Sequence, residues 1–134
     1  MEIRSPRATR KGPAETFAGD VWLDPLAKGR DPARVAVNLV PFAPGARSAW
    51  HTHAQGQTLF VLEGVGLVQA RGEPRAEIRA GDVVYTPPGE EHWHGATPRD
   101  FMAHLSVTEV PPAPMPEISW RDQVSEAEYR GEPA

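Results

Sequence analysis

Prolines and glycines interrupt this chain so often that long helices have little room. The 134 residues include 15 prolines and 12 glycines. Inside a helix, a proline costs about 3 kcal/mol and a glycine about 1 kcal/mol relative to alanine. The apolar runs between these breaks are short, which is typical of strands separated by turns. Strands at such close spacing predict an all-β fold, either an antiparallel sandwich or a barrel.

The expected strands are the apolar runs themselves, at residues 34–43, 57–64, 65–71, 75–80, 81–87 and 101–110. The second and third of these strands are expected to meet near Gly64. Residues 21–26 are expected to add an edge strand. Near the end of the chain, Ser125 and Glu128 have the spacing of a capping box, which predicts a short C-terminal helix from about Ser125.

Length and composition exclude several classes of protein. The length suits one domain over residues 1–134, with a barrel core at about 34–110. The formal net charge of -4 offers no general attraction to nucleic acid or to a membrane surface. The absence of cysteine excludes disulfides, thiolate ligands and cysteine nucleophiles. Because no apolar stretch is long enough to span a membrane and the N-terminus lacks a signal-peptide core, we expect a cytoplasmic location.

Four of the five histidines form two His-x-His pairs. His51 and His53 make one pair, and His92 and His94 make the other. Alternate residues of a strand point to the same face, so each pair can converge on one point inside a small barrel. Without thiolates, clustered imidazoles suit zinc, iron, manganese, nickel or copper. A single histidine is more often structural, but two such pairs beside turns indicate a metal site.

The fifth histidine, His104, is expected to face a pocket. It shares strand parity with Ser106 and Thr108, and a histidine with two hydroxyls on one face suggests a pocket lining. The alternative is a surface strand at the mouth of the barrel. Trp50 and Trp93 point away from the neighbouring histidines and are expected in the core or in a subunit contact. Further pocket candidates, on the strand of residues 34–43, are Asn38, Val40 and Phe42.

The two histidine motifs resemble the two consensus motifs of the cupin superfamily. Residues 45–64 carry G-x5-H-x-H-x3-Q-x6-G, and residues 81–92 carry G-x5-P-P-G-x2-H. The resemblance implies a single-domain barrel of the double-stranded β-helix, or jelly-roll, type. It also implies four metal ligands, with Gln57 where the family usually has a glutamate. These implied ligands are His51, His53, Gln57 and His92.

Nearly the whole chain resembles the small bacterial cupins that include manganese-dependent hydroxynitrile lyases. The resemblance is carried by KGPAETFAGDVWLDPL, PGARSAWHTHAQGQTL, PGEEHWHGATP and MAHLSV. It implies that His94 and His104 are active-site histidines that do not bind the metal. Enzymes of this kind cleave or form α-hydroxynitriles such as mandelonitrile. The implied cofactor is a divalent metal, manganese first, although the ligands also accept iron, zinc or nickel.

Gln57 changes the charge of the expected site. Three neutral imidazoles and an amide would leave the +2 charge of a divalent ion uncompensated by the protein. Such an ion is a stronger Lewis acid and attracts an anion or a developing oxyanion. The alternative is that Gln57 does not touch a metal and that the barrel is metal-free.

The resemblance implies a hydroxynitrile lyase with a small-molecule substrate, and the residues suggest how it would work. His94 would take the proton of the substrate hydroxyl and return it to the leaving cyanide, and His104 would assist. One alternative is an iron-dependent cupin dioxygenase that uses the same ligands. Another is a non-catalytic barrel that binds a metal or a small molecule. We expect a homodimer or a higher homo-oligomer, formed through exposed edges such as residues 21–26.

Overall fold

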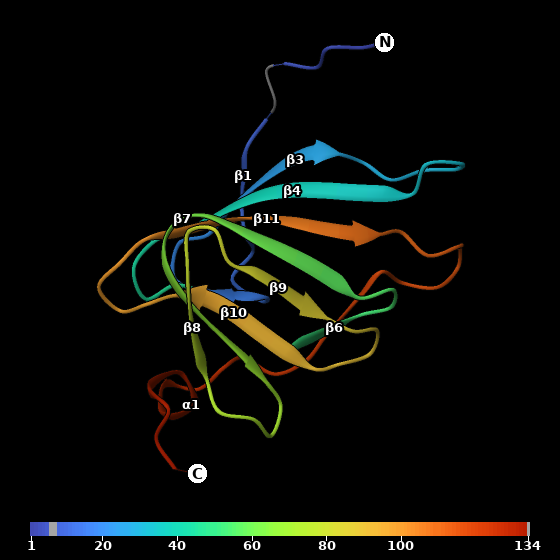
Figure 1. Cartoon of the computed structure of the whole chain (residues 1–134). Helices are drawn as coiled ribbons and strands as arrows, with labels where there is room; N and C mark the ends of the chain where they lie inside the picture. Colours follow the sequence, from blue (N-terminus) through green and yellow to red (C-terminus); the bar gives the residue numbers. More distant parts are fainter. Residues whose placement is uncertain (6–7, 134) are drawn as a thin grey trace.

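The computed structural model describes residues 1–5 and 8–133, and it shows an antiparallel sheet that curls into a barrel-like shape (Figure 1). The all-β prediction is therefore confirmed. Within the described residues the strands are β1 (Arg10–Lys11), β2 (Phe17–Ala18), β3 (Trp22–Ala27), β4 (Val35–Phe42), β5 (Arg47–Ser48), β6 (His51–His53), β7 (Gln57–Ala70), β8 (Ala76–Arg79), β9 (Val83–Thr86), β10 (His92–Ala96), β11 (Met102–Glu109) and β12 (Ile118–Trp120). One helix, α1 (Glu126–Arg130), follows them in this part of the chain.

The strands are hydrogen-bonded in the order β1-β3-β4-β11-β7-β10-β5-β2. Beside this path, β6 pairs with β10 and β12, while β8 and β9 pair with β7. The expected edge strand, β3, lies one position in from the edge, because the two-residue β1 pairs with its outer side.

The long strand β7 connects the two walls of the barrel. Its residues 57–64 pair with β11, and residues 66–70 pair with β10. The expectation of two separate strands is wrong, because β7 runs through Gly64 as one strand. In Figure 1 this long strand bends from the wall with β11 to the wall with β10. Gly64 has a φ of 80°, and a Cβ atom at this position would lie 1.8 Å from the carbonyl oxygen of Phe101. Glycine therefore permits a close backbone contact here.

The barrel interior is filled by alternate residues of its strands. On β11, the side chains of His104, Ser106 and Thr108 are buried, whereas those of Leu105 and Val107 are only half-buried. This confirms the parity predicted for β11. The main apolar cluster consists of Phe17, Val21, Val40, Phe42, Ala46, Val61, Ile78, Ala96 and Met102.

A second apolar cluster packs the C-terminal segment against the back of β10. Its members are Trp50, Leu67, Trp93, Val124 and Tyr129. The hydroxyl of Tyr129 donates to the carbonyl oxygen of Ala96 at 2.6 Å, which fixes α1 to β10. Trp50 and Trp93 are almost fully buried in this cluster, so of the two expected positions, the core or a subunit contact, they take the core.

The short helix α1 begins as its sequence predicts. The Ser125 side chain accepts from the backbone N–H of Glu128, and the Glu128 side chain accepts from the backbone N–H of Ser125. This capping box satisfies two backbone donors that the helix cannot satisfy itself. No helix in the described part of the chain is long and apolar enough to cross a membrane.

Candidate metal centre

Strand pairing brings together histidines that lie about forty residues apart in the sequence. In the pairing of β6 with β10, His51 lies directly opposite His92. The ligand nitrogens of His51, His53 and His92 all lie within 4.8 Å of one another, and all three side chains are buried. We call these three residues the ligand cluster. The three imidazoles together could therefore hold one metal ion.

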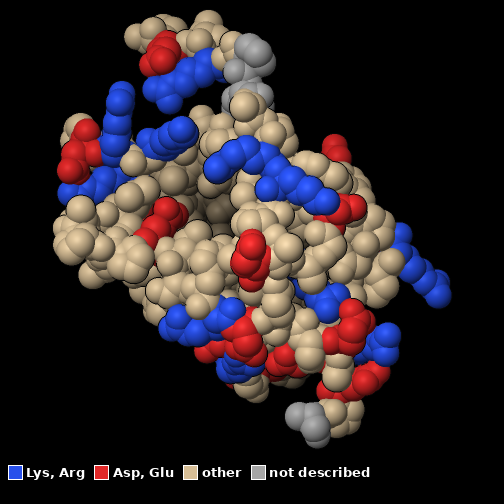
Figure 2. Space-filling model, turned by 180° about the vertical axis from the view of Figure 1, so that it is seen from behind, with Lys and Arg blue, Asp and Glu red and all other residues tan. Residues whose placement is uncertain are grey.

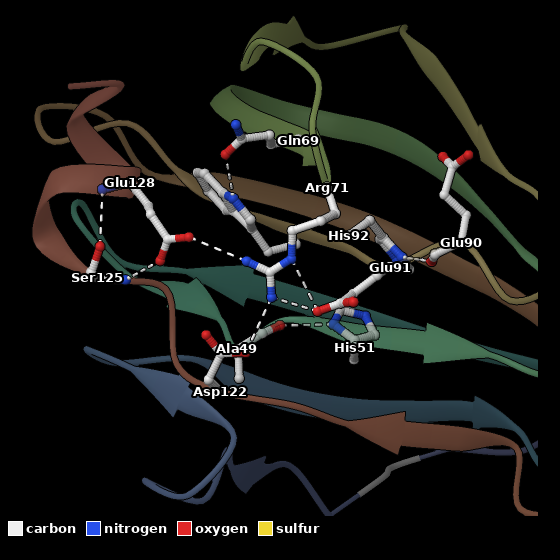
Figure 3. Close-up of polar contacts among 11 residues, drawn as sticks. Ala49, His51, Gln69, Arg71, Glu90, Glu91, His92, Asp122, Ser125 and Glu128 are labelled. Carbon is white, nitrogen blue, oxygen red and sulfur yellow. Dashed lines mark hydrogen bonds and ion pairs between the residues drawn. The ribbon is translucent and has the colours of Figure 1, made fainter. Parts of the chain in front are cut away.

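Two rings of the ligand cluster are oriented by their own backbone (Figure 3). Nδ1 of His51 lies 2.8 Å from the carbonyl oxygen of Ala49, and Nδ1 of His92 lies 3.0 Å from that of Glu90. Each Nδ1 therefore carries the proton and donates it to the carbonyl. This leaves Nε2 of both rings with a free lone pair, which is the state a metal ligand requires.

Gln57 directs its side-chain carbonyl oxygen towards the ligand cluster. Its Nε2 donates to Oγ of Ser106 at 2.8 Å, and its Oε1 lies 3.1 Å from Nε2 of His92. A neutral imidazole has one N–H, which His92 donates to Glu90, so this second contact joins two acceptors. A cation beside both atoms would remove their repulsion. The donors present therefore fit a divalent ion, and Ser106 fixes the amide in the required orientation.

The environment keeps the ligand cluster uncharged at neutral pH. Burial, and next the charge of His92, lower the pKa of His53 to about 4. Burial also lowers the pKa of His51 and of His92 below the usual 6.5. Both ring nitrogens of His53 are buried without a hydrogen-bond partner among the described residues. A neutral, unpartnered imidazole is ready to bind a metal ion.

His94 and His104 form a second, separate arrangement, which we call the histidine pair. Nε2 of His104 lies 3.1 Å from Nδ1 of His94, and both residues are buried. Burial lowers the pKa of His104 to about 4, and burial together with His104 lowers that of His94 far below its usual range. Nε2 of His94 and Nδ1 of His104 have no partner in the described structure. The pair can thus share a proton internally and exchange one with a bound molecule.

The histidine pair and part of the ligand cluster line the same cavity. Its volume is about 380 Å³, within the range of small-molecule sites. One face of the molecule is visibly hollowed near its middle, with charged groups at the rim (Figure 2). The residues of the predicted site that line the cavity are Asn38, Val40, His53, Gln57, His94, His104 and Thr108.

Phe42 has a different position from the one expected. It is fully buried and is absent from the residues that line the cavity. Its ring packs against those of His104 and His94, with centroids 5.3 and 6.0 Å apart. Phe42 therefore supports the histidine pair from the apolar core instead of facing the pocket.

The sequence did not reveal several residues around this site. Trp120 on β12 packs against the ring of His51, with centroids 4.7 Å apart. Oγ of Ser48 accepts from the backbone N–H of His94 at 3.2 Å, and Glu117 accepts from the hydroxyl of Thr108. Trp120 and Glu117 reach the site through a segment without any recognisable motif, so only the pairing of β12 with β6 could have located them.

Comparison with known proteins agrees with the fold and the motifs. Residues 38–107 match the model of the Cupin domain family. The chain is 47% identical over 132 residues to an (R)-mandelonitrile lyase of Granulicella tundricola, covering 97% of this chain and 99% of the relative. It is 33% identical over 89 residues to a dimethylsulfoniopropionate lyase of Ruegeria pomeroyi, covering 65% of this chain and 58% of that relative.

Among solved structures, a cupin-like protein from Thermotoga maritima is similar over almost the whole length. Its TM-score is 0.86 at 35% sequence identity, with 98% of each chain covered. A predicted oxalate decarboxylase of the same organism has a TM-score of 0.71 at 23% identity, covering 83% of this chain and 100% of that one, and is alike in fold alone. Given the family match over more than half of its residues, this chain belongs to the cupin family.

Proposed function

We propose that this protein is a metal-dependent hydroxynitrile lyase, which cleaves cyanohydrins such as mandelonitrile into an aldehyde and hydrogen cyanide. The observation that carries the proposal is the histidine pair, which lies beside the ligand cluster and faces the same cavity. The 47% identical mandelonitrile lyase supports the choice of reaction. Fold alone would not, because cupins with similar sites need not share a substrate.

The proposed metal ligands are Nε2 of His51 and His92, one ring nitrogen of His53, and Oε1 of Gln57. A bound divalent ion, for which manganese is our first candidate, would act as a Lewis acid on an oxygen of the substrate. Because all four donors are neutral, the protein would not reduce the positive charge of the ion. Ser106 holds the Gln57 amide, and the carbonyls of Ala49 and Glu90 hold the rings of His51 and His92, in the absence of a metal ion.

In the proposed reaction, Nε2 of His94 accepts the proton of the substrate hydroxyl. The C–O bond becomes a carbonyl while the bond to the nitrile carbon breaks, and the electron pair leaves with cyanide. The histidine pair then returns the proton to cyanide. The 3.1 Å contact between the two rings lets His104 share the charge while the proton is held.

The cavity walls suit an aromatic or aliphatic cyanohydrin. Phe17, Leu23 and Val40 give the cavity apolar walls, and polar side chains line the rest, among them Asn38 and the charged Arg10 and Glu117. Apolar walls combined with polar groups at fixed positions are typical of a site that orients a small molecule.

The test is mandelonitrile cleavage by protein that has been stripped with a chelator and then reloaded. We expect no benzaldehyde from the stripped protein and full recovery with Mn²⁺, compared in parallel with Fe²⁺, Zn²⁺ and Ni²⁺. Binding of these ions without cleavage of any cyanohydrin would contradict the proposal and favour a non-catalytic barrel. Oxygen uptake by the iron form with a catechol-like or diketone substrate, without cyanohydrin cleavage, would favour a dioxygenase.

A further inference from the structure

Arg71 directly follows β7 and is not among the residues that line the cavity. Its guanidinium stacks over the ring of Trp50, 3.8 Å from the ring centroid. The same guanidinium forms ion pairs with Glu91 at 2.5 Å, Asp122 at 3.1 Å and Glu128 at 3.3 Å. Figure 3 shows the contacts of this guanidinium with Glu91, Asp122 and Glu128. One side chain therefore contacts four segments of the chain.

Two of these contacts join Arg71 to the residues directly before metal-ligand candidates. Trp50 precedes His51, and Glu91 precedes His92. The backbone N–H of Arg71 also donates to the carbonyl oxygen of Glu91 at 2.8 Å. Arg71 is thus attached to both segments that carry a ring of the ligand cluster.

Those two segments also set the orientation of the rings. The ring of His51 is held by the carbonyl of Ala49, and the ring of His92 by that of Glu90. Each ring is therefore fixed within a tripeptide, at residues 49–51 and 90–92. The guanidinium contacts the middle residue of each tripeptide, Trp50 in one and Glu91 in the other. It therefore connects the two segments that orient Nε2 of His51 and of His92.

We propose that Arg71 is a positioning residue for the metal centre, because it fixes these two tripeptides relative to each other. The inference rests on the proposed metal function of the ligand cluster. A planar guanidinium can stack on an indole and pair with several carboxylates at once, whereas a lysine ammonium offers only a point charge. Residues behind the ligands typically change metal affinity by about tenfold to a hundredfold.

The chain offers a matched control at Arg75. This arginine donates to the carbonyl oxygen of Tyr129 at 2.5 Å and so also secures the C-terminal helix. Among the described contacts, it reaches neither of the two tripeptides. Arg75→Ala therefore weakens the attachment of α1 without touching the segments that carry His51 and His92.

The experiment is a titration of the metal-free, full-length protein with Co²⁺, followed by calorimetry and by visible absorption. For Arg71→Ala we expect a Kd about tenfold higher than that of the parent, and altered absorption bands because the ligand geometry has changed. Arg71→Lys should recover part of the affinity but not the parent spectrum. Arg75→Ala should match the parent in both Kd and spectrum.

Distinct outcomes separate this inference from the proposed function. If neither the parent nor His51→Ala binds Co²⁺, the metal centre itself is wrong. If the parent binds and Arg71→Ala binds equally with the same spectrum, Arg71 has no positioning role. Thermal unfolding of each apo variant is measured alongside. Should Arg71→Ala fail to fold, Arg71→Lys decides, and parent-like affinity and spectrum in that variant would overturn the inference.

Discussion

The ligand cluster and the histidine pair consist of the same residue type within one barrel, yet their hydrogen bonding differs. In the ligand cluster, His51 and His92 are each anchored through Nδ1 to a backbone carbonyl. In the histidine pair, His94 and His104 bond to each other, and their outer nitrogens have no partner among the described residues. An anchored ring presents a fixed lone pair, which suits metal binding. A ring bonded to another ring can pass a proton.

The difference arises from the local backbone as well as from neighbouring strands, because the His92 ring is held by the carbonyl of Glu90 while the His94 ring meets His104. His92 and His94 are two residues apart on β10 and face the same interior. Both residues pair with β7, opposite Ala70 and Val68. His92 also lies opposite His51 on β6, whereas His94 meets His104 from β11. Strand register thus assigns different chemical environments to two histidines of one motif.

The largest expected effect comes from removing a member of the ligand cluster. His53→Ala should weaken Mn²⁺ binding by more than about a hundredfold, because a direct donor is lost and not merely a residue behind the donors. Cleavage of mandelonitrile should fall with the metal content. His104→Gln is the control from the histidine pair and should keep the Mn²⁺ affinity of the parent. Equal affinity in His53→Ala and the parent would remove the distinction between the two groups.

A second effect concerns acid stability and the histidine pair. The pKa of His104 is about 4 in the folded protein, against 6.5 when unperturbed. As the pH falls, His104 is therefore protonated in the unfolded state before it is protonated in the folded state. Its effect on the free energy of unfolding is absent above about pH 6.5, and that free energy declines as the pH falls towards 4. The expected loss is on the order of 3 kcal/mol for this group.

Urea unfolding of the metal-free protein between pH 7 and pH 4 measures that loss. His104→Gln removes the titrating group, so its free energy of unfolding should depend less steeply on pH than that of the parent. Identical pH profiles would mean that burial of His104 does not suppress its protonation.

The smallest of these effects concerns the charge of the metal centre. Gln57→Glu should tighten Mn²⁺ binding about tenfold, which corresponds to 1.4 kcal/mol. It should also lower kcat for mandelonitrile, because a carboxylate reduces the Lewis acidity of the ion. Ser106→Ala is the control, because it removes the hydrogen bond that orients the Gln57 side chain without changing the charge of that side chain. A faster Gln57→Glu enzyme would show that the neutral amide is not needed for the reaction.

Much of the fold could be predicted because local patterns and tertiary packing agree in the barrel walls. The alternation along β4 and β11 predicted their inner faces, and the capping box predicted the start of α1. Gly64 was misinterpreted because a glycine can mark either a strand end or a close backbone contact, and the sequence does not distinguish them. Only the position of the Phe101 carbonyl decides between the two.

The candidate site was predictable where its residues lie within a motif, and not where they come from elsewhere. The two His-x-His patterns and strand parity predicted that histidines of both motifs converge, and the resemblance to cupins implied which three of them would be ligands. Arg71 carries no motif, and its partners at 50, 91, 122 and 128 are distant in sequence. Phe42 lies in the core and not in the pocket, which also depends on packing. The β4 pattern predicts that its side chain faces the interior, but not whether that side chain reaches the cavity.

The most direct test of the division between the two groups is His94→Ala, with metal content and activity measured on the same sample. We predict that the variant retains the Mn²⁺ content of the parent, while its rate of mandelonitrile cleavage falls by about 10²- to 10⁴-fold, the range for loss of a general acid–base group. Cleavage at the parental rate, or loss of the metal together with activity, would contradict the assignment of metal binding to the ligand cluster and proton transfer to the histidine pair.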